Sequence, residues 1–331
     1  MTILIHDLHL GVLRSAGTLP TTALALRQNL LDNFEKILST VDEDLVILGD
    51  LMDTGGIPMV DLLSTYRILE SWLVKGHKLV LVNGNHDLNT DSSKLSSFQF
   101  LAALLSDNPN VSHVSSGQFI SDDVYVVSHV LNQDRFDIEI SEVPACKYLL
   151  LHCNYNNFFA SGDHSLNLSE QQAKDCKVEF IVVAHEHHSR QELKGKVYIP
   201  GNQFPSSVSD CLDREDKFMT RLGEKPEPIK TWAKENYLEL DWRNPAKSEA
   251  QFIRFVGHAK PDEAADMANV IARYRKDSKA FVVSNAVKVS ENEDANEMTA
   301  NSLEAIRGFD VMAALKDLLT KEENEILESL T

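Results

Sequence analysis

The sequence lacks the features that mark membrane-spanning and disulfide-stabilised proteins. Its 331 residues contain no apolar run long enough to cross a bilayer, so we expect no membrane-spanning helix. The chain starts without the basic and apolar segments of a signal peptide, because residues 2–5 have the pattern of a short strand. The four cysteines show no CxxC spacing, which fits reduced thiols rather than disulfides or a structural zinc site. We therefore expect a cytoplasmic protein.

Positive charge is also scarce, since 32 Lys and Arg residues face 50 Asp and Glu residues, for a formal net charge of -18. A uniformly acidic surface repels nucleic acid, which argues against a passive DNA-binding module. The argument is weaker against a nuclease, because bound metal ions offset acidic ligands and a local basic strip can hold the substrate.

The first 200 residues alternate between strand and helix patterns. This alternation predicts helices packed around a β core, and the strand-dense later part predicts a second sheet, so we expect a two-sheet α/β sandwich with helices outside. The expected strands are Thr2–Ile5, Leu45–Leu48, Lys78–Val82, Val124–Val130, Tyr148–Leu151, Phe180–Val183 and Lys196–Ile199, and the expected helices are Ala23–Leu38, Met59–Lys75 and Lys94–Leu105.

The remaining chain divides into a linker, a small α/β unit and a tail. Ser209–Glu235 is polar and irregular, so we interpret it as a linker or an excursion of the chain. Ser290–Asn301 is acidic and polar, and Gly308–Leu330 has amphipathic helical periodicity. We expect a catalytic domain over residues 1–208, a linker and capping domain over 209–289, and an acidic linker with C-terminal helices over 290–331. The capping unit is predicted from strands Tyr237–Leu240, Gln251–Val256 and Ala280–Val283 and helix Asp262–Arg275.

Side chains that can bind metal recur directly after the apolar strands. Ligand sites in α/β sheets lie beyond the carboxyl ends of the strands, so five strands deliver these groups to one edge. Imidazole and carboxylate together suit manganese, iron, zinc or cobalt better than calcium. The candidate ligands are Asp7, His9, Asp50, Asn85, His152, His185 and His187.

Asp50 is the central carboxylate of this set and the natural bridge between two cations. Two cations held about 3.5–4 Å apart can clamp a phosphate and activate a water. The leaving alkoxide of a phosphate ester needs a proton, and His86 adjoins the ligand Asn85. We expect His86 to be the acid, with Asp87 orienting its ring.

Other titratable residues near these motifs are expected to be non-catalytic. Asp53 and His188 adjoin the ligands, and we interpret Asp53 as a support and His188 as a support or a surface residue. The other histidines follow no strand motif and are expected to be structural or on the surface: His6, His77, His113, His129, His164 and His258.

Together these motifs resemble those of the calcineurin-like metallophosphoesterase superfamily. The resemblance covers roughly the first 200 residues and implies a four-layered αββα fold. By position it implies that Asp7, His9 and His187 hold one metal, that Asn85, His152 and His185 hold the other, and that Asp50 bridges them. His86 would contact the substrate phosphate. The motifs read Asp7-Leu8-His9, Gly49-Asp50-Leu51-Met52-Asp53, Gly84-Asn85-His86-Asp87, His152 and Ala184-His185-Glu186-His187, with Ala184 where the family usually has Gly.

Within this superfamily the chain is most similar to SbcD-type DNA-repair nucleases, in a short phage-type version. The similarity rests on Asp7-Leu8-His9-Leu10-Gly11, on Ile199-Pro200-Gly201-Asn202 and on the trailing strand–helix–strand unit. It implies a DNA exonuclease with two cations, typically Mn²⁺, while Mg²⁺, Fe²⁺, Co²⁺ and Zn²⁺ stay open. It also implies single-strand endonuclease activity, an ABC-type ATPase partner at the C-terminal helices, a homodimer and, for a viral chain, the host cytoplasm.

Two other activities fit the same ligand set. A small-molecule phosphodiesterase or phosphatase, acting for example on cyclic nucleotides, would use the same site, and the acidic charge favours it. A phosphoprotein phosphatase is disfavoured, because Thr54 stands where that branch has an Arg and Asp87 where it has a Glu. A non-catalytic scaffold is disfavoured because none of the seven ligands is missing.

Overall fold

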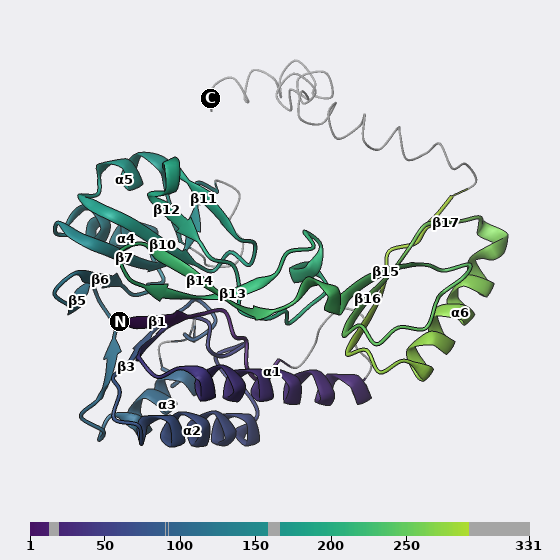
Figure 1. Ribbon diagram of the computed structural model, residues 1–331, viewed down its shortest axis with the longest axis horizontal. Helices are drawn as coiled ribbons and strands as arrows, with labels where there is room; N and C mark the ends of the chain where they lie inside the picture. The colour runs from purple at the N-terminus through teal and green to yellow at the C-terminus, as the bar shows by residue number, and fades with distance from the viewer. Residues whose placement is uncertain (13–19, 90, 92, 158–165, 291–331) are drawn as a thin grey trace, which may run out of the picture.

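Two stacked six-stranded β-sheets form the centre of the molecule in the computed structural model, which describes residues 1–12, 20–89, 91, 93–157 and 166–290 (Figure 1). The first sheet has the order β14 (Pro226–Trp232), β13 (Lys217–Leu222), β1 (Thr2–Ile5), β2 (Asp44–Leu48), β3 (Leu79–Val82) and β4 (Val111–Val114). The second has the order β11 (Arg190–Glu192), β12 (Val197–Ile199), β10 (Val178–Ala184), β7 (Cys146–His152), β6 (Val124–Val127) and β5 (Gln118–Ser121).

Alternating side chains on the central strands divide the core into layers. In β1, Leu4 faces the second sheet, whereas Ile3 and Ile5 join the cluster formed with the outer helices. In β2, Val46 and Leu48 take the inner side in the same way. Successive side chains of a strand point to opposite faces, so strands that are apolar at every position suit a sheet buried on both sides.

Helices cover both outer faces of this pair of sheets. The first sheet is covered by α1 (Pro20–Thr40), α2 (Met59–Leu73) and α3 (Ser97–Leu105), and the second by α4 (Gln133–Ser141) and α5 (Glu170–Asp175). Ser96 and Ser169 begin α3 and α5 with capping boxes, in which a serine and a glutamine satisfy each other's backbone amides. The expected αββα sandwich is therefore confirmed.

A smaller α/β unit follows the sandwich. It contains β15 (Tyr237–Asp241), β16 (Phe252–Val256) and β18 (Val282–Asn285) in a parallel sheet, with α6 (Ala264–Asp277) against it (Figure 1). Tyr237 and Phe252 also belong to the main apolar cluster, so this unit packs onto the sandwich. The short remaining elements are β8 (Asn154–Tyr155), β9 (Asn167–Leu168), β17 (His258–Ala259), β19 (Lys288–Val289) and 3-10 turns at Leu193–Gly195, Ser209–Cys211, Lys234–Asn236 and Pro261–Glu263.

The expectation of an irregular linker over Ser209–Glu235 is wrong. Two strands, β13 and β14, lie in this segment, and β13 pairs antiparallel with β1 in the first sheet. The sequence pattern did not predict the second strand because it contains Pro226 and Pro228. Proline is compatible with a strand only at special positions, such as the sheet edge that β14 occupies. We propose that the capping unit begins after Trp232 rather than at residue 209.

The tail lies outside the described residues. This applies to residues 291–331, which include nearly all of the acidic linker and the C-terminal helices expected to dock an ATPase, and also to His164. Among the helices of the part that the structure describes, none is both long and apolar enough to span a membrane.

Candidate metal centre

The candidate ligands lie in loops that leave the carboxyl ends of the parallel strands. The loop after β1 is joined to the loop after β2 by backbone hydrogen bonds, in which the amides of Leu8 and His9 both donate to the Asp50 carbonyl. Asp7, His9, Asp50 and His185 all have left-handed backbone angles, with φ of 50, 48, 50 and 91°. Such angles are uncommon outside glycine and cluster at functional sites, where surrounding structure holds them.

Two glycines let these loops approach each other closely. A Cβ atom on Gly49 would lie 2.3 Å from Nδ1 of His152, and one on Gly84 would lie 2.1 Å from Oδ1 of Asp50. Both distances are far below van der Waals contact. Residues 49 and 84 must therefore lack a side chain for Asp50 and His152 to occupy their positions.

Asp7, His9 and His187 form one ligand cluster, with one ligand atom from each within 4.8 Å of the others. The Nε2 atoms of His9 and His187 lie 3.1 Å apart, and Oδ1 of Asp7 lies 3.9 Å from Nε2 of His187. The other Asp7 oxygen, Oδ2, is held by the backbone amide of His185 at 3.0 Å and by Nδ1 of His6 at 2.5 Å. Asp7 therefore presents a single oxygen to the cluster.

Asp50, His152 and His185 form a second cluster by the same distance criterion. Nε2 of His152 lies 3.3 Å from Oδ2 of Asp50 and 3.1 Å from Oδ1 of Asn85. The opposite ring nitrogen of His152 lies 3.0 Å from the Leu48 carbonyl oxygen, which fixes a proton at Nδ1 and leaves Nε2 for the cluster. Asp50 also belongs to a third cluster with His9 and His86, so it lies between the two groups of ligands.

The donor set fits two divalent cations. Oδ1 of Asp7 is buried without a hydrogen-bond partner, and such an oxygen is costly unless a cation faces it. Two imidazole Nε2 atoms 3.1 Å apart likewise suit a shared ion, because each presents a lone pair when its neutral ring carries the proton on Nδ1. The mixture of imidazole, carboxylate and amide oxygen is typical of transition-metal sites.

The carboxylates and imidazoles of the centre perturb one another strongly. Burial alone would lower the pKa of His152, but Asp50 outweighs burial and raises it to about 10. Burial, together with the neighbouring His187, lowers the pKa of His9 to about 4. The pKa of Asp50 lies below its ordinary value despite burial, because His152 stabilises the carboxylate. The deep part of the centre is thus a carboxylate site that favours positive charge.

His86 lies at this centre, but the expectation that Asp87 orients its ring is wrong. Nδ1 of His86 lies 2.6 Å from the backbone carbonyl oxygen of Asp53. Asp87 is fully buried, and its two oxygens instead accept the backbone amides of Met52 and Gly84 at 3.0 and 2.9 Å. Asp87 therefore ties the second motif to the third, and it cannot contact a substrate.

Three residues of the centre were not recognised from the sequence as part of it. His6 is fully buried and holds Asp7, and His129 is buried with its ring 6.3 Å from that of His152. Oδ1 of Asp210 lies 2.7 Å from Nδ1 of His187, although the two residues are 23 positions apart. The expected strand Val124–Val130 enclosed His129, whereas β6 ends at Val127 and leaves His129 beyond the strand end, and no motif marked Asp210.

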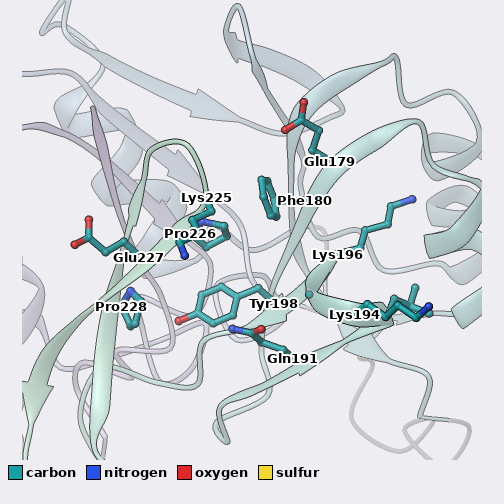
Figure 2. Close-up of a pocket in the computed structure, with 12 residues that line it drawn as sticks. Glu179, Phe180, Gln191, Lys194, Lys196, Tyr198, Lys225, Pro226, Glu227 and Pro228 are labelled. Atoms are coloured by element: carbon teal, nitrogen blue, oxygen red, sulfur yellow. The ribbon is translucent and has the colours of Figure 1, made fainter.

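The pocket in Figure 2 lies away from this centre. Its volume is about 540 Å³, and its wall includes Phe180, Tyr198 and Lys225. Phe180 stands near the start of β10, whereas His185 follows the end of the same strand, about 15–20 Å away at 3.3 Å per residue. Nζ of Lys196 donates to the Lys174 and Cys176 carbonyl oxygens, which occupies two of its three N–H groups.

Comparison with known proteins gives the same picture of this centre. The family model for calcineurin-like phosphoesterases matches residues 3–189, which is more than half of the chain and contains all seven candidate ligands. The chain belongs to this family. Its members are metal-dependent hydrolases of phosphate esters and typically carry two cations, which agrees with the ligand clusters of this phosphoesterase.

Comparisons at the level of whole proteins add little about this phosphoesterase. The crystal structure of TT1561 of Thermus thermophilus is similar, with 16% sequence identity and a TM-score of 0.40, over 70% of this chain and 98% of that chain. No curated protein sequence matches the phosphoesterase. The branch and substrate of the phosphoesterase therefore have to be argued from its own residues.

Proposed function

We propose that this phosphoesterase is a metal-dependent DNA exonuclease that works with two divalent cations, normally Mn²⁺. The observation that carries the hydrolytic part is the convergence of Asp50 with both histidine clusters beside His86. When bound, the cations would supply an activated water and neutralise charge on the phosphodiester. The remaining work of the reaction falls to the side chains of the chain itself.

The centre is buried on one side and open on the other. Asp7, Asp50 and His152 are each at most 1% exposed, whereas His86 and His187 are half-buried. A phosphodiester therefore approaches from the side of the two histidines. We assign His86 to the departing oxygen. The Asp53 carbonyl accepts a proton from Nδ1 of His86, which supports this role because Nε2 then remains free to donate.

The sequence motifs shared with DNA-repair nucleases and the charge distribution support DNA as the substrate. Residues 237–290, which form the smaller α/β unit, contain nine Lys and Arg residues against seven Asp and Glu residues, in a chain whose net charge is -18. Arg273 and Lys276 are exposed on the last two turns of α6. A locally positive surface lets an acidic protein contact the phosphate backbone.

A small-molecule phosphodiesterase or phosphatase is the second candidate. The acidic charge outside the capping unit favours it, because a small substrate needs no extended contact with the protein surface. Both candidates use the same ligands, so only the substrate separates them.

A cleavage assay separates the two candidates. End-labelled single- and double-stranded DNA and bis-p-nitrophenyl phosphate are incubated with the protein in Mn²⁺, Mg²⁺ or EDTA, beside the His86→Ala variant. We expect Mn²⁺-dependent release of label from DNA that is lost in the variant, and the label position gives the cleavage polarity. Hydrolysis of the small diester with intact DNA would refute the nuclease and support the second candidate.

A further inference from the structure

A segment beyond the family match packs against the last candidate ligand. Residues 206–217, which we call the clamp segment, include the 3-10 turn Ser209–Cys211 and the start of β13. Four of its side chains, those of Asp210, Asp213, Glu215 and Lys217, contact the stretch from His187 to Ser189. The family match ends at residue 189, so this support comes from a separate part of the chain.

Asp210 is aimed at the ring of His187 from a fixed position. Its side chain is 4% exposed, and Oδ1 lies 2.7 Å from Nδ1 of His187. Oδ2 accepts the backbone amides of Ser206 and Ser207 at 2.9 and 3.0 Å and the Ser206 hydroxyl at 3.2 Å. Both oxygens are therefore occupied, and the carboxylate acts on the ring rather than on a cation.

Lys217 and Glu215 hold the backbone of the same stretch. The Lys217 side chain is 1% exposed, which is rare for lysine and requires partners for its charge. Its Nζ donates to the His187 carbonyl oxygen at 2.8 Å and to Oε1 of Glu215 at 3.0 Å. The same Glu215 oxygen accepts the backbone amide of Ser189 at 3.0 Å. The ring and the backbone of His187 are thus fixed by one segment.

We propose that Asp210 is a positioning residue that keeps the proton of His187 on Nδ1, so that the lone pair of Nε2 would be available to a cation in the cluster of Asp7, His9 and His187. The inference rests on the dinuclear centre of the proposed function. A carboxylate behind a ligating imidazole fixes the tautomer and the ring orientation. Lys217 and Glu215 keep the stretch in place while Asp210 sets the chemistry of the ring.

Replacing Asp210 with Asn tests the tautomer directly. Two amides and a hydroxyl donate to the Oδ2 position, so the Asn oxygen must take that place and its NH₂ group must face His187. Nδ1 then becomes an acceptor, and the proton moves to Nε2, where it blocks the cation. In Asp210→Ala the ring keeps its choice of tautomer. We therefore expect metal affinity to be highest in the wild type, lower in Asp210→Ala and lowest in Asp210→Asn.

If Asp210 only supported the loop structure, Asp210→Asn would bind metal more tightly than Asp210→Ala. Asn has the shape of Asp and still accepts the serine amides, whereas Ala loses all of these bonds. The order of the two variants therefore distinguishes a positioning role from a structural one.

Asp213 provides a matched control in the same segment. Its Oδ2 lies 2.8 Å from Nδ1 of His188, which adjoins His187 but is not a candidate ligand. Asp213→Asn removes the same charge from an Asp–His pair without touching the ligand. We expect the Mn²⁺ affinity of this variant to equal that of the wild type.

The measurement is a calorimetric titration of Mn²⁺ into full-length, EDTA-stripped protein, with thermal unfolding in EDTA as the check on folding. We expect the wild-type chain to bind two Mn²⁺. In Asp210→Asn we expect the Mn²⁺ affinity of the site formed by Asp7, His9 and His187 to be about 10- to 100-fold lower. Unchanged affinity in Asp210→Asn, or weaker binding in Asp210→Ala than in Asp210→Asn, overturns the positioning role alone. Should Asp210→Asn not fold, equal affinities of Asp210→Ala and Asp213→Asn overturn it. A wild type that binds no Mn²⁺ overturns the metal centre as well.

Discussion

The backbone carbonyl oxygen of Asp53, rather than a carboxylate, lies 2.6 Å from Nδ1 of His86. A carbonyl can only accept, so it assigns a proton to Nδ1 and leaves Nε2 for the departing oxygen. His86 also lies beside His9, with ring centroids 5.0 Å apart in an edge-to-face arrangement. The acid of the proposed reaction is therefore held by main chain at the rim of the metal centre.

The first prediction concerns His86→Ala. We expect kcat on bis-p-nitrophenyl phosphate or DNA to fall by about 10²- to 10⁴-fold, because the leaving group loses its acid. Mn²⁺ stoichiometry, measured by calorimetry, should remain at two. Loss of one Mn²⁺ in this variant would show that His86 is a ligand, which its distance to His9 and Asp50 permits.

The second prediction concerns the carboxylate shared by the clusters. Asp50→Asn should lose both Mn²⁺, because Asp50 lies between the two groups of ligands and the amide carries no charge. Asp61→Asn is the comparison, since Asp61 is a buried carboxylate paired with Arg27 on the far side of the first sheet. Retention of two Mn²⁺ by Asp50→Asn would contradict the assignment of Asp50 as the bridge.

The third prediction concerns the close approach at Gly84. In Gly84→Ala the added Cβ meets Oδ1 of Asp50 and must displace it, which we expect to cost about 1–3 kcal/mol of stability and to weaken Mn²⁺ binding. Gly56 is the matched control, because a Cβ there meets nothing within 4 Å. Chemical unfolding and Mn²⁺ titration measure both effects. Equal stability and equal Mn²⁺ affinity of Gly84→Ala and Gly56→Ala would contradict the close approach at Gly84.

The fourth prediction is a pH dependence of stability from Glu215. Partial burial would raise its pKa, but His188 and Lys217 outweigh burial and lower it from 4.5 to about 2. A lowered folded-state pKa stabilises the protein above pH 4.5, and this stabilisation is lost as the pH falls through about 2. The difference in unfolding free energy between wild type and Glu215→Gln should therefore be largest near neutral pH and smaller at pH 3, in urea titrations. A difference that grows toward acid would contradict the ion pair.

The fifth prediction concerns DNA contact by the capping unit. The double variant Arg273→Glu and Lys276→Glu should bind DNA more weakly, and the slope of log affinity against log salt should become shallower by about two. Lys36→Glu, an exposed lysine on α1, is the control for net charge. Equal slopes of log affinity against log salt in the wild type, the double variant and Lys36→Glu would show that the capping unit does not contact DNA.

The strand-end ligands could be predicted because each carries its chemistry in its residue type and follows an apolar strand. The layers could be predicted for a related reason, since Leu4 and Val46 belong to strands that are apolar on both faces. The support for the ligands could not be predicted in the same way. A main-chain carbonyl such as that of Asp53 leaves no mark in a sequence, and Asp210 reaches His187 only because β13 returns the chain to β1.

The prolines of β14 have a consequence for how molecules of this chain can associate. This strand forms the edge of the first sheet, and an open edge invites a strand from another molecule to add to it. Positions 226 and 228 have no N–H, so a strand arriving there finds no donor at two alternate positions. Strand addition at this edge is thereby disfavoured, and a strand from a second molecule would meet fewer missing donors at the other sheet edges, β4, β5 and β11.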